Sequence, residues 1–182
     1  MVNPLPFDSL ELRCTLGAFA TGITVISIID ADGKPQGITV NSFNAVSLNP
    51  PLILWSLAFD TFNFEAFQTA KRFAVNILAE DQVAISERFA SPLNDKFAGL
   101  KVSAGLGSVP LLDGCVAALE CLTETTYPGG DHIIILGLVE RLHRYTRSPL
   151  LYHNGNYMAV GRQLPTPQES IPSFWSSWAT VR

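Results

Sequence analysis

The chain has 182 residues, of which 47% are hydrophobic and 15% are charged. This length fits one domain with an ample apolar core, and the composition excludes a disordered protein. The 12 basic and 16 acidic residues give a net charge of −4, and no run of Lys or Arg occurs. Nucleic-acid binding needs a basic stripe, so the sequence disfavours that class of function.

The three cysteines, Cys14, Cys115 and Cys121, form no CxxC pair and lie in apolar surroundings. This pattern predicts buried free thiols in a reducing compartment. The first residues lack a basic segment followed by an apolar run, and no apolar stretch is long enough to span a bilayer. We therefore expect a cytoplasmic location.

The sequence pattern of the N-terminal third predicts a helix followed by a β-hairpin. Asp8 and Glu11 have the spacing of a capping box, so we expect an amphipathic helix over residues 8–19 that packs against the rest of the fold. The β-branched run 23–29 and the stretch 37–43 are typical of two strands, and Asp32-Gly33 provides the tight turn between them.

Strands and helices then alternate along the chain. We expect a strand buried on both faces at 52–57, a helix over 62–69 capped by Asp60 or Thr61, a strand at 73–78, and a helix over 81–89 capped near Glu80 or Asp81. Residues 90–97 have no periodicity and predict a loop, and residues 100–114, which contain several glycines, predict a connecting segment.

The last third is predicted to be mainly strand. Residues 115–125 alternate with one more polar face, 132–142 is a long β-branched strand after a turn at 127–131, and 157–160 is a short final strand. Gly137 inside the long strand predicts a bulge or a close backbone approach. Short strands, tight turns and two or three helices together predict an antiparallel barrel with helices at its ends.

A cluster of short polar side chains follows the predicted hairpin. We call residues 39–47 the polar corner; its donors are Thr39, Asn41, Ser42, Asn44 and Ser47. Short side chains let a ligand approach the backbone N–H groups, so the corner can bind an anion without a charge of its own. The alternative is a plain hairpin corner without a ligand.

Two stretches resemble the flavin reductase family: GITVNSFNAVSLNPPLILWSL at 37–57, and Gly-Gly-Asp-His at 129–132. The resemblance implies an antiparallel Greek-key split β-barrel over residues 1–164, a homodimer with sites at the subunit interface, and binding of FMN or FAD. It also implies hydride transfer from NADH or NADPH, and release of the reduced flavin to a separate monooxygenase component. The tail 165–182, which carries Phe174, Trp175 and Trp178, is expected to pack on the barrel or on the dimer partner.

The family pattern implies which residues contact the flavin. Those expected at the ring edge and ribitol are Thr39, Val40, Asn41, Ser42, Ala45 and Val46. Those expected at the phosphate side are Ser56, Leu57, Ala58 and Thr61, with Lys96 near the phosphate or ribose. Phe62 or Phe89 is expected to line the slot for the ring. For the aromatic residues the alternative is core packing, and for Lys96 it is an ordinary surface position.

His132 is the candidate catalytic residue. In the family this position lies where NADH or NADPH enters over the flavin, so the resemblance implies a hydrogen bond to the nicotinamide amide or the pyrophosphate. A role as proton donor is less favoured, because hydride transfer mainly needs stacking and orientation. The alternative is a strand-end histidine that caps backbone groups. Tyr157 either helps to hold the dinucleotide or packs in the core.

Other classes of site lack their signatures. His132, His143 and His153 have no metal-ligand spacing, so no zinc or iron site is expected, and there is neither a GxSxG elbow nor a Rossmann glycine fingerprint. Two other functions stay open: a barrel that binds flavin or haem without turnover, and a lipocalin-like barrel that carries an apolar ligand.

Overall fold

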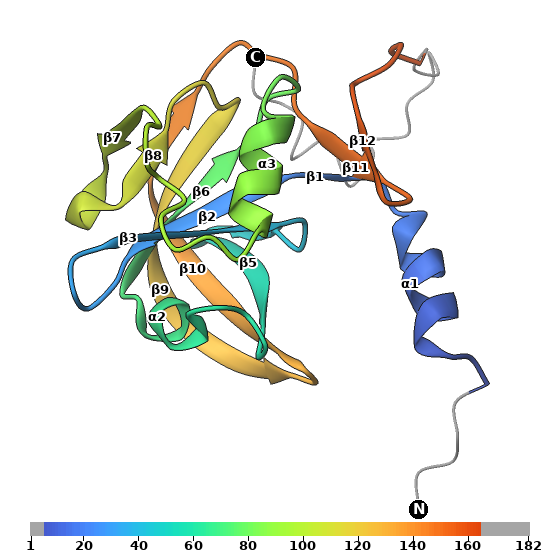
Figure 1. Ribbon diagram of the computed structural model, residues 1–182, viewed down its shortest axis with the longest axis horizontal. Helices are drawn as coiled ribbons and strands as arrows, with labels where there is room; N and C mark the ends of the chain where they lie inside the picture. The colour runs from blue at the N-terminus through green and yellow to red at the C-terminus, as the bar shows by residue number, and fades with distance from the viewer. Residues whose placement is uncertain (1–5, 165–182) are drawn as a thin grey trace, which may run out of the picture.

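The computed structural model describes residues 6–164, and the tail at 165–182 lies outside this range. Its main unit is a curled antiparallel sheet with strand order β3-β2-β6-β9-β10-β5-β4 (Figure 1). The strands are β2 (Thr24–Ile29), β3 (Pro35–Val40), β4 (Asn44–Leu48), β5 (Pro51–Ala58), β6 (Arg72–Ile77), β9 (Ala117–Gly129) and β10 (His132–Arg144). The predicted mainly β, antiparallel architecture with a few helices is confirmed.

The sheet is curled, and side-chain hydrogen bonds rather than a backbone ladder join the chain just after β3 to β5. The Ser42 hydroxyl, just after β3, donates to the Ser56 carbonyl of β5 at 3.2 Å and accepts from the Ser56 amide at 3.0 Å. Nearby, the Asn63 side chain donates to that of Gln36 at 3.0 Å. The two Ser42 bonds reach β5, so the polar corner lies where the two ends of the curled sheet approach each other.

The main core fills the inside of the curled sheet. Trp55 and Phe73 are almost fully buried there, with ring centroids 5.9 Å apart. Gly137 of β10 lies against the Phe73 ring, where a Cβ atom would collide with it, and the pairing with β9 shifts register at this residue. The predicted bulge and close approach at Gly137 are both confirmed.

A second core cluster lies beneath α3 (Val83–Ala90). The buried rings of Phe89 and Phe97 meet edge to face there, with centroids 4.9 Å apart. A separate small sheet contains β1 (Thr21–Gly22), β11 (Leu151–His153) and β12 (Asn156–Met158). The last of these strands is shorter than the one predicted over 157–160.

The segment at 100–114 is more ordered than a connector. It forms a hairpin of β7 (Val102–Ala104) and β8 (Pro110–Leu112) around the short helix η1 (Leu106–Ser108). All three residues of β8 are buried. The strands are too short to show a period, so sequence pattern alone does not reveal them.

The helix α1 (Ser9–Gly17) begins as predicted, since the Asp8 carboxylate accepts the Glu11 amide at 2.8 Å. The expectation that it packs against the barrel is wrong within a single chain. None of its residues is buried, and the helix lies apart from the large sheet (Figure 1). Cys14 is consequently exposed, which corrects the prediction of three buried thiols, whereas Cys115 and Cys121 are buried.

Three further local predictions need correction. The helix α2 (Phe64–Thr69) follows Asn63 in a left-handed conformation, and α3 follows Gln82, so neither begins at the predicted caps. The second half of the polar corner is the edge strand β4 rather than a loop. Only one face of β5 is buried, because its other face lies on the outside of the barrel. Among the described residues, no helix is long and apolar enough to cross a membrane.

Candidate functional site

The pairing of β5 with β10 brings the two resembling stretches together. His132 lies opposite Ala58, and Ile134 lies opposite Ser56. Since side chains alternate along a strand, His132, Ser56 and Ala58 share one face, which we call the outer face. Ser56 is also the residue bonded to Ser42. Strand pairing and these bonds thus bring His132, Ser56 and the polar corner into one region of the fold, although they are distant in sequence.

His132 is oriented by its neighbour in the turn. Its Nδ1 lies 2.6 Å from the Asp131 carboxylate, and this hydrogen bond is the main cause that lowers the pKa of Asp131. The Asp131 carbonyl also accepts the Phe59 amide at 3.1 Å, which ties the turn to the end of β5. With Nδ1 bonded to the carboxylate, Nε2 remains to meet a ligand.

The donors of the polar corner divide into used and unused groups. The hydroxyl of Ser42 holds the backbone of Ser56, and that of Thr39 donates to the Ser86 carbonyl at 2.7 Å. Within residues 6–164, no hydrogen bond uses the Asn41 amide or the Thr61 hydroxyl. At Val46 the pairing of β4 with β5 shifts register, which leaves a backbone position outside the regular ladder.

Ser86 links two of the predicted residues and was not singled out from the sequence. Besides the bond from Thr39 to its carbonyl, its hydroxyl lies 3.1 Å from the Tyr157 hydroxyl. Ser86 is buried on α3, three residues before the buried Phe89. A small polar residue on the buried face of a helix was the only available signal.

Lys96 is held by two backbone carbonyls. Its ammonium donates to the carbonyls of Phe89 at 2.8 Å and Gly37 at 3.1 Å, so it joins the C-terminal end of α3 to β3. Burial lowers the pKa of Lys96. Two of its three donors are therefore engaged with the backbone, and one remains for a ligand.

Two of the predicted contacts conflict with burial. The Phe89 ring is 0% exposed within the second core, so it cannot line an open slot, whereas Phe62 is 53% exposed. The Leu57 side chain faces the main core and cannot contact a ligand. Val40 is half buried against the same core, and Ala45 is exposed on β4. The predictions for Phe89 and Leu57 fail because both side chains point into the core, and the family pattern does not specify the direction of a side chain.

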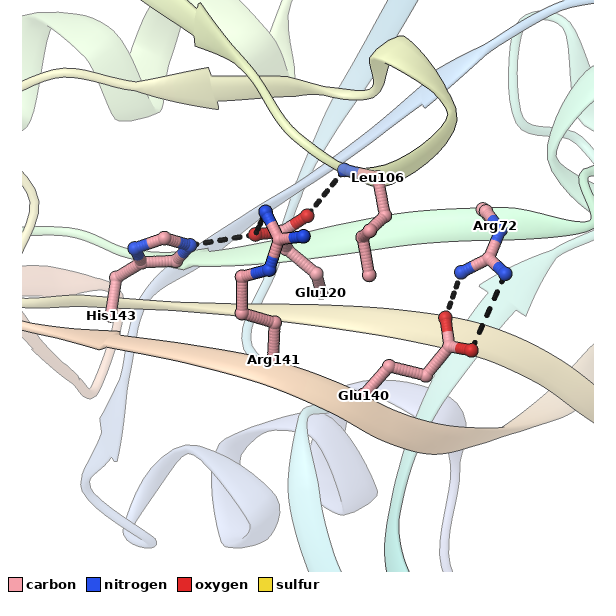
Figure 2. Close-up of polar contacts among 6 residues, drawn as sticks. All are labelled: Arg72, Leu106, Glu120, Glu140, Arg141 and His143. Carbon is pink, nitrogen blue, oxygen red and sulfur yellow. Dashed lines mark hydrogen bonds and ion pairs between the residues drawn. The ribbon is translucent and has the colours of Figure 1, made fainter.

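A second polar cluster lies at the other end of β10 (Figure 2). The buried carboxylate of Glu120 lies 2.6 Å from His143 Nε2 and 3.5 Å from an Arg141 nitrogen, and it accepts the Leu106 amide of η1. Beside it, Arg72 pairs with Glu140. Burial would raise the pKa of Glu120, but these hydrogen bonds and the Arg141 charge outweigh it, and the pKa lies below its usual value. This cluster holds the β7–β8 hairpin on the sheet.

A family model described as a flavin reductase like domain matches residues 16–161. A "Probable flavin reductase" of Rhizobium meliloti is 42% identical over 151 residues, covering 83% of this chain and 49% of that protein. The reductase subunit HsaB of a flavin-dependent monooxygenase from Mycobacterium tuberculosis is 35% identical over 171 residues, covering 92% of this chain and 88% of the relative.

Among solved structures, an NADH:FAD oxidoreductase from Streptomyces globisporus, in complex with NAD and FAD fragments, superposes with a TM-score of 0.79. It shares 33% sequence identity, and the match covers 93% of this chain and 100% of that one. The present chain spans about half the length of the Rhizobium relative.

Proposed function

The chain belongs to the flavin reductase like domain family, and we propose that it is an NAD(P)H:flavin oxidoreductase. The proposed reaction is hydride transfer from NADH or NADPH to FMN or FAD. The observation that carries the proposal is the register of β5 and β10, which aligns His132 with the outer face beside the polar corner. A histidine alone, or a polar loop alone, would give this proposal much weaker support.

The residues at this surface fit a flavin and a dinucleotide. A bound flavin accepts hydride at N5 from C4 of the nicotinamide, and the protein has to bind and orient the two groups. Asn41, Thr61 and the backbone at Val46 supply unused polar groups, and Phe62 supplies an exposed ring. His132 Nε2 is suited to a hydrogen bond with the nicotinamide amide, and the free donor of Lys96 to a phosphate or ribose oxygen.

The partner in the proposed reaction is a separate flavin-dependent oxygenase that receives the reduced flavin. The name of the HsaB relative describes it as a reductase subunit of a monooxygenase, and we extend that role to this chain. We also infer a cytoplasmic location, since the three free thiols are typical of a reducing compartment.

We propose that the protein is a homodimer through the outer face. Along β5 and β10 this face carries a partly exposed apolar stripe next to His132: Leu52, Leu54, Ile134, Leu136 and Leu138. The exposed apolar residues of α1, such as Leu10 and Leu16, provide further surface for a partner. Contiguous apolar surface of this kind is typical of subunit interfaces.

Light scattering after gel filtration tests the dimer. We expect a dimer for the wild type and a monomer for Leu136→Glu, because a charge at the centre of the stripe would be buried without a partner. Leu142→Glu is the matched control on the same strand and should remain dimeric, since the register shift at Glu140 puts Leu142 on the face opposite to the stripe. A monomeric wild type would refute the interface.

The activity is tested with purified protein, NADH or NADPH, and FMN or FAD in air. Rapid, flavin-dependent oxidation of NADH or NADPH, compared with a control without protein, would support the reductase activity. The rates would also rank the four combinations of nucleotide and flavin. Bound flavin without turnover would favour the flavin-binding module instead. No binding of flavin at all would favour the barrel with an apolar ligand and refute the proposal.

A further inference from the structure

Three elements meet at Ser86, a residue that is only 1% exposed. Thr39 comes from β3, Ser86 from α3 and Tyr157 from β12. The Thr39 hydroxyl lies 2.7 Å from the Ser86 carbonyl oxygen, and the Tyr157 hydroxyl lies 3.1 Å from the Ser86 hydroxyl. The Tyr157 ring is also held by Tyr152, with centroids 5.6 Å apart. Ser86 thus joins a predicted flavin contact to a predicted dinucleotide contact.

The direction of one of these bonds is set by chemistry. A carbonyl oxygen only accepts hydrogen bonds, so the Thr39 proton points to the Ser86 carbonyl. The Thr39 oxygen can therefore offer only its lone pairs to a ligand. Such an acceptor suits an imide N–H or a sugar hydroxyl and disfavours a phosphate oxygen, which also accepts.

We propose that Ser86 is a positioning residue of the site, and this rests on the proposed function. Its hydroxyl holds Tyr157 in the orientation that binds the nicotinamide dinucleotide, and its carbonyl holds Thr39 as an acceptor toward the flavin. The two contacts use different atoms of Ser86. Ser86→Ala removes the first and leaves the second in place, so the two effects separate.

The test is a double-mutant cycle on flavin-dependent NADH oxidation with Ser86→Ala, Tyr157→Phe and the double variant. Each single change removes the same hydrogen bond, so we expect each to raise the KM for NADH about fivefold. The double variant should also show about fivefold, because contacting residues are not additive. Flavin affinity, measured by fluorescence titration, and kcat should stay at the wild-type values.

The Ser86→Ala variant keeps α3 helical, because Ala is a better helix former than Ser. Thr69→Ala is the matched control: it removes a hydroxyl that bonds only within its own helix, at the Glu65 carbonyl, and it should leave the KM unchanged. If the double variant instead shows the product of the single effects, or Ser86→Ala lowers flavin affinity as much as it raises KM, the positioning role is refuted. An inactive wild type would refute the proposed function itself, and this inference with it.

Discussion

Each end of β10 carries a histidine paired with a carboxylate, but one carboxylate is exposed to solvent and the other is buried. His132 and His143 each lie 2.6 Å from a carboxylate. The Asp131 side chain is 93% exposed, whereas that of Glu120 is 3% exposed. A distance alone therefore does not separate a candidate binding residue from a structural one, and the burial of the carboxylate does.

The β-bulge at Glu140 explains why the second pair exists. Ile133, Ile135 and Val139 point to the main core, and a regular strand would send Arg141 and His143 to the same side. The pairing with β9 shifts register between Val139 and Arg141, which moves both residues to the side of Glu120. At this end the strand therefore satisfies a buried carboxylate, and at the other end it leaves His132 available.

The largest expected effect is on stability. Glu120→Ala removes the acceptor of the Leu106 amide and leaves the Arg141 and His143 side chains without their buried partner. We expect the free energy of unfolding, measured with urea, to fall by about 3 kcal/mol. Asp131→Ala, the exposed counterpart, should leave the unfolding midpoint unchanged. Similar losses in both variants would contradict the distinction by burial.

An intermediate effect is expected on activity. His132→Ala should raise the KM for NADH about tenfold through loss of a hydrogen bond to the dinucleotide, with flavin affinity unchanged. His143→Ala should instead leave the KM for NADH unchanged and lower the urea concentration at the midpoint of unfolding. Wild-type kinetics in His132→Ala would remove this residue from the site.

The smallest effect is expected in the pH dependence of stability. A carboxyl group whose pKa is lowered in the folded protein stabilises the fold above its ordinary pKa, here 4.5 for Glu120, and this contribution disappears as the pH falls through the lower folded value. Urea unfolding below pH 4.5 should therefore show a steeper loss for the wild type than for Glu120→Gln. Asp131→Asn should follow the wild type, since solvent screens its exposed pair. Parallel curves for wild type and Glu120→Gln would show that Glu120 makes no such contribution.

Local patterns in the sequence determined much of the fold. The cap at Asp8, the hairpin of β2 and β3, the long strand β10 and the special role of Gly137 follow from spacings of a few residues. Such features depend on neighbours in the chain, so sequence alone carries them. The same holds for the two stretches that identify the family.

Only the tertiary structure decided which side chains of the site are available. Register brings His132 beside Ala58, and burial removes Phe89 and Leu57 from the surface. The Gly37 carbonyl, far along the chain, engages Lys96. Ser86 acquires its two partners in the same way. These contacts join residues dozens of positions apart, and strand pairing and packing, not local spacing, determine them.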